Sequence, residues 1–191
     1  MRLILFVSLA FVLIGCTPSP QMPEPLGLAY LANKPLRLNV ARIEVVKQYQ
    51  SSSKPPHIEN ELPIPPTAMI QQWTQDRLLS VGKTGYAVVT IEEASVVEIP
   101  LKGTKGLRGY FTVDQSEQYD VKLSVKIEIF DDLGQSKGSA YARAQGSRTV
   151  SENFTLGQRR KVWIHMMEKI MNTLNEELDR NMQAHLGSYL Q

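Results

Sequence analysis

Cysteine is nearly absent from this chain, whose 191 residues include only one, Cys16. A lone cysteine excludes an internal disulfide and a zinc site built from several thiolates. The chain also lacks an excess of either charge, because 21 Lys and Arg residues stand against 19 Asp and Glu. That balance argues against the general basic attraction by which many proteins bind nucleic acid. The length suits one domain, or one domain with a tail, and is sufficient to bury a sizeable core.

A long hydrophobic run is missing too. The most apolar stretch, Leu3 to Ile14, has twelve residues and one polar side chain, Ser8. As a helix it would be about 18 Å long, well short of the ~30 Å hydrocarbon core of a bilayer. Arg2 supplies a positive charge ahead of it. This pattern is typical of a signal peptide over residues 1–15 and not of a membrane span.

The residues that end the apolar stretch, Leu13-Ile14-Gly15-Cys16, resemble the lipobox of bacterial lipoproteins. The resemblance implies signal cleavage between Gly15 and Cys16, a diacylglycerol on the Cys16 thiol and, usually, a further acyl chain on the new amine. One acyl chain binds a membrane only marginally, whereas two or three hold firmly. The plain alternative is an ordinary buried cysteine at the end of an apolar helix.

The lipobox resemblance also implies a cellular location. Lipoproteins kept at the inner membrane typically carry Asp after the cysteine, and this chain carries Thr17. We therefore expect attachment on the periplasmic side of a bacterial membrane, with the outer membrane favoured over the inner. Between residues 16 and 35 the chain has five prolines, which cannot donate to a helix or a sheet. They predict a tether over residues 16–35, followed by a single domain over residues 36–191.

The domain contains both strand and helix patterns. In the clearest strand, Tyr119 to Phe130, apolar and polar residues alternate, as in a strand with one covered face. A helical spacing of apolar residues follows two consecutive prolines at 65 and 66. We expect, in order, a strand over residues 36–45 with a bulge near Ala41, a helix over 67–81, and strands over 86–99, 119–130 and 137–150.

A long helix should complete the domain. Thr155 and Gln158 have the spacing of a capping box. Apolar residues at three- and four-residue steps then form one stripe, made of Trp163, Met166, Met167, Ile170, Met171, Leu174, Leu178, Met182 and Leu186. One face of the preceding strand carries only small residues, which allow close packing of a helix: Ala140, Ala142, Ala144 and Gly146. We predict an α+β fold in which two helices cover one face of an antiparallel sheet of three to four strands, in the order β-α-β-β-β-α.

No catalytic constellation emerges from the residue pattern. Residues 81–84 resemble the end of a phosphate-binding loop, but Arg77 stands where the earlier glycine should be, and the motif follows a helix instead of preceding one. His165 and His185 would lie about 30 Å apart on one helix, too far to share a metal. Three carboxylate pairs fall in surface contexts: Glu92-Glu93, Asp131-Asp132 and Glu176-Glu177. We expect no enzyme, no metal and no cofactor.

A glycine-rich loop between the second and third large strands is the first candidate binding site. Glycines recur every third residue, at Gly103, Gly106 and Gly109, among cationic and apolar side chains. The candidate contact residues for a protein partner or an anionic lipid are Lys102, Lys105, Leu107, Arg108, Tyr110 and Phe111. The alternative is a flexible hairpin connection whose aromatic rings fold back on the domain.

A basic cluster, Arg159-Arg160-Lys161, is the second candidate site. Cations in the first turns of a helix oppose its dipole, at a cost of a few tenths of a kcal/mol each. The offset is either a local carboxylate such as Glu152 or an acidic partner such as lipid headgroups. A simple solvated face is the alternative.

The layout as a whole resembles small α/β envelope lipoproteins of proteobacteria, such as ABC-transport auxiliary or outer-membrane assembly lipoproteins. The shared features are the Leu13 to Cys16 start, the proline-rich tether, the hairpin around Tyr119 to Val150 and the long last helix. The resemblance implies a non-enzymatic binding or scaffold component of envelope assembly or lipid transport, with an envelope protein as partner. The alternatives are a carrier of lipid or lipopolysaccharide, which needs an apolar cavity between helices and sheet, and a cell-wall enzyme.

Overall fold

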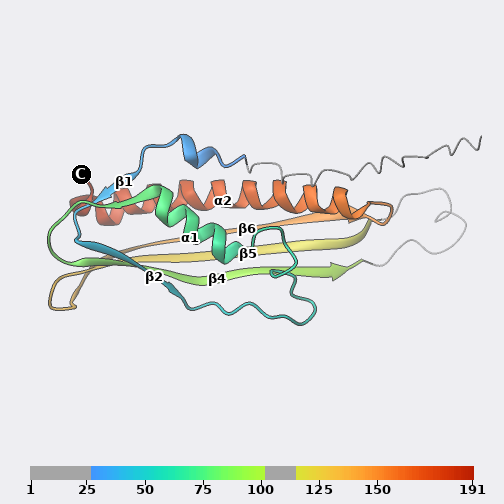
Figure 1. The fold of residues 1–191 in the computed structure, drawn as a ribbon, viewed down its shortest axis with the longest axis horizontal. Helices are drawn as coiled ribbons and strands as arrows, with labels where there is room; N and C mark the ends of the chain where they lie inside the picture. Colours follow the sequence, from blue (N-terminus) through green and yellow to red (C-terminus); the bar gives the residue numbers. More distant parts are fainter. Residues whose placement is uncertain (1–26, 102–114) are drawn as a thin grey trace, which may run out of the picture.

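A computed structural model describes residues 27–101 and 115–191. The fold is α+β, with a long helix lying along a sheet of long strands (Figure 1). The elements are η1 (Ala29–Ala32), β1 (Leu36–Leu38), β2 (Arg42–Lys47), α1 (Pro66–Arg77), β3 (Leu78–Ser80), β4 (Tyr86–Pro100), β5 (Gln115–Phe130), β6 (Ser136–Ser151), α2 (Leu156–Leu186) and η3 (Gly187–Tyr189).

The main sheet has four strands in the order β2-β4-β5-β6. The β4/β5 and β5/β6 pairs are antiparallel, but β2 runs parallel to β4. The α+β prediction is confirmed, and the expectation of a purely antiparallel sheet is wrong at this one pair. A parallel pair needs a long crossover, and residues 48–85, which include α1, make that connection.

The strand expected over residues 36–45 is two strands that belong to different sheets. β1 pairs with β3 in a small parallel sheet, whereas β2 joins the main sheet. Strand pairing is interrupted at residues 39–41, where a bulge was expected, and the amide of Val40 donates to the carbonyl of Leu38. The helix expected over 67–81 ends at Arg77, because Leu78–Ser80 pair with β1 and become β3.

Part of the expected tether belongs to the folded domain. Residues 29–32 form η1, and Tyr30 is 1% exposed within the core. Burial, followed by the charge of Asp76, raises the pKa of the Tyr30 hydroxyl to about 12. The backbone amide of Gly27 donates to the Glu168 carboxylate on α2. Residues before Leu36 therefore pack on the described domain, because η1 lies against both α1 and α2.

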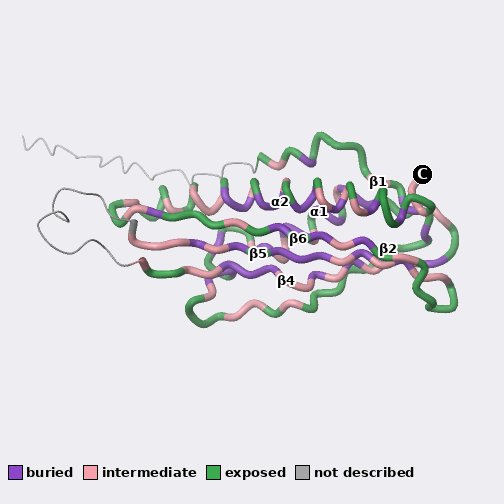
Figure 2. Tube along the Cα trace, turned by 180° about the vertical axis from the view of Figure 1, so that it is seen from behind, coloured by how far each residue is buried: buried purple, intermediate pink, exposed green. Residues whose placement is uncertain are grey.

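The core lies between the helices and one face of the sheet, and buried positions alternate along the long strands (Figure 2). The small-residue face of β6 meets α2, as expected, and α2 begins with the predicted Thr155–Gln158 capping box. The predicted apolar stripe of α2 is buried apart from Trp163, which is partly exposed. The methionines of α2 are therefore core residues. Neither helix of the described chain has the length and apolar character needed to cross a membrane.

Candidate functional site

Two groups of predicted functional residues lie outside the described residues. Gly15 and Cys16 fall in residues 1–26, and the candidate contacts of the glycine-rich loop fall in residues 102–114. The loop candidates are Lys102, Lys105, Leu107, Arg108, Tyr110 and Phe111. Their roles stay predictions.

The third group, the basic cluster at the start of α2, divides into one paired and two exposed cations. Arg159 forms an ion pair with Glu117 on β5, and its guanidinium also lies 3.5 Å from the Tyr119 hydroxyl. Arg160 and Lys161 are exposed to solvent. For Arg159, a local carboxylate, Glu117, therefore offsets the unfavourable interaction with the helix dipole.

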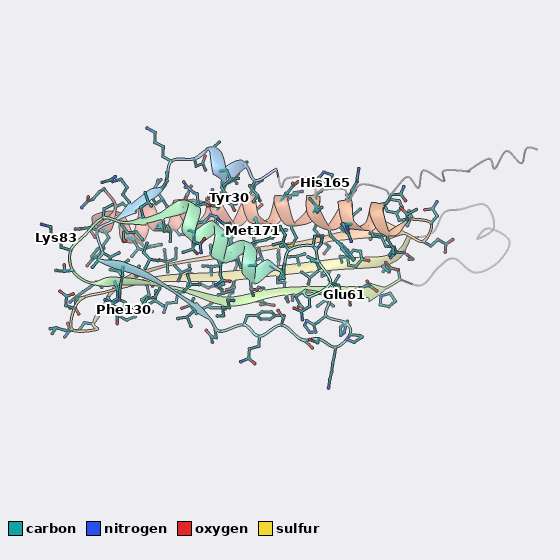
Figure 3. All side chains as sticks on the ribbon, in the orientation of Figure 1. Tyr30, Glu61, Lys83, Phe130, His165 and Met171 are labelled. Carbon is teal, nitrogen blue, oxygen red and sulfur yellow. The ribbon has the colours of Figure 1, made fainter. Side chains whose placement is uncertain are left out.

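A groove lies between β6 and α2. It holds about 440 Å³ and is lined by residues 145–148 of β6 and by one flank of the N-terminal half of α2. The α2 side contributes Val162, His165, Met166, Lys169, Ile170 and Thr173. His165 lies on this half of the helix (Figure 3). The groove thus combines an apolar wall with polar and cationic rims.

The lining of this groove contains cations and no carboxylate. Arg148 and Lys169 are exposed, and no acidic residue is among the lining residues. Within residues 27–101 and 115–191, neither side chain takes part in an ion pair or hydrogen bond. An anionic ligand in the groove would therefore meet two cations that are not already neutralised.

The local sequence explains why strand and helix approach each other here. At Gly146, a Cβ would stand 2.7 Å from Cδ1 of Ile170, so only glycine allows this separation without a shift. Further along, the Asn181 side-chain amide donates to the Tyr141 carbonyl of β6 over 2.6 Å. The helix thus follows the outer edge of β6, and the groove lies where edge and helix leave space between them.

Sequence reasoning did not find this groove, although a signal was present. Strand alternation places Arg148 on the same face of β6 as Ala144 and Gly146. His165 and Lys169 are four residues apart and share a face of α2. The sequence therefore predicts a cation on the small-residue face of the strand and a cationic face on the helix. It predicts a shared site only once the strand is known to lie against that helix.

A second pocket, of about 190 Å³, lies at the opposite end of the sheet. Its charges are used internally: Lys137 lies 2.8 Å from Asp131, and the Gly85 amide donates to Asp132 over 2.7 Å. Because these groups satisfy each other, this pocket offers a ligand less unpaired charge than the groove does.

A buried carboxylate, Glu59, fastens the loop before α1 to the sheet. Its Oε1 accepts hydrogen bonds from the Tyr49 hydroxyl (2.7 Å) and the Val96 amide (3.0 Å), and it lies 2.8 Å from Nδ1 of His57. Burial raises the pKa of Glu59, but the hydrogen bonds of His57, Tyr49 and Val96 together hold it below its ordinary value. These contacts anchor the proline-rich loop along β4, beyond the end of β2.

The chain is similar to two solved structures of lipoproteins. A minor lipoprotein from Acinetobacter baumannii is 13% identical, with 80% of this chain and 96% of that chain covered and a TM-score of 0.39. Rare lipoprotein B from Shewanella oneidensis is 9% identical, with 77% and 94% covered and a TM-score of 0.37. No protein-family model and no curated protein matches the chain.

Proposed function

We propose that this protein is a lipoprotein on the periplasmic side of a bacterial membrane, anchored through Cys16, whose domain binds a partner without catalysing a reaction. The leader pattern that ends at Gly15-Cys16 supports the anchor. Thr17 after the cysteine favours the outer membrane. The process that this binding serves is envelope assembly or lipid transport.

The observation that carries the binding role is an open groove on the surface of a domain whose described residues form one buried core. Large side chains such as Trp73, Ile70, Met171 and Leu174 are fully buried between the helices and the sheet. A scaffold needs an exposed patch on a packed domain, whereas a carrier needs an apolar cavity in its interior. The open groove between β6 and α2, with its unpaired cations, therefore supports a scaffold.

A lipid carrier is the second candidate, and the composition of the groove is the observation that favours it. Val162, Met166 and Ile170 offer apolar surface beside Arg148 and Lys169, which suits an anionic headgroup joined to an acyl chain. Native mass spectrometry of protein purified from membranes separates the two candidates. Co-purifying lipid at one molecule per chain would identify a carrier, and lipid-free domain would support the scaffold.

The anchor is tested by Cys16→Ser in cells fed an alkyne-labelled fatty acid. We expect the label to be lost and the protein to leave the membrane fraction, because no other thiol is present. Ser19→Ala is the matched control and should keep both label and location. Unchanged membrane fractionation of Cys16→Ser would contradict the anchor.

The binding role is tested by crosslinking in intact membranes. The wild-type protein should form crosslinks with one or a few envelope proteins, identified by mass spectrometry.

The predicted loop contacts are tested in the same experiment by a double variant, Tyr110→Ala with Phe111→Ala, which should weaken capture while thermal stability is kept. A matching loss of stability would instead make these rings part of the core. Failure of the wild type to capture any envelope protein would contradict the scaffold.

A further inference from the structure

We propose that the groove between β6 and α2 receives an extended, acidic segment of a partner polypeptide, which adds as a strand to the edge of β6. This inference rests on the proposed binding role and names the site and the chemistry of its partner. Three features of the described residues support it: the backbone at the strand edge, the helix wall and the charge.

The backbone of β6 presents unpaired groups to the groove. β6 is the last strand of the sheet and pairs only with β5 within the described chain. In an antiparallel pair, alternate residues direct both N–H and C=O away from the neighbouring strand. The carbonyl of Tyr141 points outward, because it accepts from Asn181 on α2. By the same alternation, the amides and carbonyls of Gln145 and Ser147 point outward, and both residues line the groove.

The helix wall gives the groove the form in which extended peptides bind. Addition of a strand to a sheet edge supplies affinity through main-chain hydrogen bonds, while pockets for alternate side chains supply specificity. Here the flank of α2 offers Val162, Met166 and Ile170 to the side chains that face the helix. At Tyr141 the helix itself closes the edge through Asn181, so the added strand ends before this point.

The positive charge of the groove favours an acidic segment. The whole of β6 contains no Asp or Glu, and its charged residues are Lys137, Arg143 and Arg148. With Lys169 on the facing helix, the groove carries cations only. Cations along an edge strand oppose pairing with a second copy of the same edge, because both edges carry the same sign. They attract an acidic strand for the same reason.

The backbone also favours a peptide over an anionic headgroup. An outward edge alternates donors with acceptors, so a peptide strand can satisfy both kinds of group. A phosphate accepts hydrogen bonds but leaves the outward carbonyls of Gln145 and Ser147 unsatisfied and close to negative charge. We therefore assign the groove to a polypeptide, and test the lipid as the competing occupant.

Binding is measured by fluorescence anisotropy on the full lipidated protein in nanodiscs of neutral phosphatidylcholine. The probe is a fluorescein-labelled peptide of about eight residues, ~26 Å long as a strand, in which Glu alternates with Val and Thr. We expect saturable binding that weakens with salt. The double variant Arg148→Gln with Lys169→Gln should weaken it about tenfold. The matched pair Lys83→Gln with Arg180→Gln removes two exposed cations outside the groove and should leave the affinity unchanged.

Two modified peptides test the mode of binding on the wild-type protein alone. A peptide with Lys in place of Glu should not bind, and a peptide N-methylated along one edge should lose binding because it cannot donate to β6. Equal binding by the N-methylated peptide would overturn strand addition. In a third arm, vesicles of phosphatidylglycerol are offered to the full chain. The double variant Arg148→Gln with Lys169→Gln is tested in the same way. If it abolished vesicle binding and left peptide binding intact, the occupant would be a lipid and the proposal would be wrong.

Position-specific photo-crosslinking separates this inference from the proposed function. A photoreactive residue at Thr173, which lines the groove on α2, is compared with one at Lys83, an exposed residue outside the groove. Capture of a partner from position 173 and not from position 83 supports the groove. Capture from position 83 alone would overturn the groove while leaving the binding role intact, and the absence of capture from any position would contradict both. Circular dichroism melts confirm that each variant is folded.

Discussion

Arg77 and Asp179, 102 positions apart, form a two-pronged ion pair between the helices. The guanidinium of Arg77, at the end of α1, donates to both carboxylate oxygens of Asp179 on α2, over 2.8 and 2.7 Å, and is 2% exposed. Its Nε donates to Asn175 over 3.0 Å, and the same Asn175 oxygen accepts from the Trp73 indole over 2.9 Å. A further bond reaches the Lys34 carbonyl. One buried cation thus holds the N-terminal segment, α1 and α2 together.

Removal of Asp179 should destabilise the domain strongly. In Asp179→Ala, the buried guanidinium loses its counter-charge, and we expect the free energy of unfolding to fall by about 3 kcal/mol. The measurement is urea denaturation followed by circular dichroism. The double variant Arg77→Met with Asp179→Leu removes both charges and should be more stable than Asp179→Ala. A double variant less stable than the single would contradict an energetic role for the pairing.

Gly82 is a position where only hydrogen fits. A Cβ there would stand 2.5 Å from backbone atoms of Asn39 and Val40, at the break between β1 and β2. Because backbone cannot move aside as a side chain can, Gly82→Ala should lower the free energy of unfolding by about 3 kcal/mol. Gly187→Ala is the control, since a Cβ at Gly187 meets nothing within 4 Å. It should change stability by less than about 0.5 kcal/mol. Equal effects would contradict the steric reason.

Glu59 should give the domain a dependence on acid pH. Its pKa is below the ordinary 4.5 in the folded protein, so its charged form stabilises the fold above that value. The contribution is lost as the pH falls through the folded pKa, because the folded protein must then take up a proton. Glu59→Gln should therefore be less stable than the wild type near neutral pH, by about 2 kcal/mol.

The test is denaturation of both proteins between about pH 7 and pH 3. The two stability curves should approach each other as the pH falls below 4.5, because the wild-type carboxyl is then increasingly protonated in both states. Glu61→Gln, an exposed change two residues away, should follow the wild type throughout. A difference between Glu59→Gln and the wild type that stayed constant with pH would show a packing effect instead of a charge effect.

The capping box of α2 should contribute measurably to stability. The Thr155 hydroxyl accepts from the Gln158 amide over 3.3 Å, and the Gln158 side chain accepts from the Thr155 amide over 2.8 Å. Thr155→Ala should cost about 1 kcal/mol. Thr173→Ala, an exposed threonine within the same helix, is the control and should be neutral or slightly stabilising, because alanine favours helix. A loss as large in the control would argue against the cap.

Local patterns were sufficient for much of the fold. Alternation identified the long strands, since a strand with one covered face repeats every two residues. The stripe from Met166 to Leu186 and the Thr155 cap identified α2, and both signals come from residues a few positions apart. These predictions succeed because the physical cause lies within the segment itself. The lipid anchor at Cys16 is of the same kind and stays a prediction.

Local patterns did not predict which strands and helices lie beside each other. The separation of β1 from β2, the end of α1 at Arg77 and the parallel pairing of β2 with β4 all depend on contacts with distant segments. A strand pattern shows which face is apolar but not which strand lies beside it, so the sheet was expected to be wholly antiparallel. The Glu59 contacts and the Arg77–Asp179 pair likewise join residues whose neighbourhood exists only after folding.

The sequence by itself therefore determined the long strands, the last helix, their apolar faces and the expected location of the protein, because periodicity, capping and the residues around Cys16 are local. Only the tertiary structure decided the site. The groove lies where α2 packs along β6, which brings Arg148 and Lys169 to one opening. Their meeting depends on packing across the strand edge and helix, and no spacing along the chain contains that information.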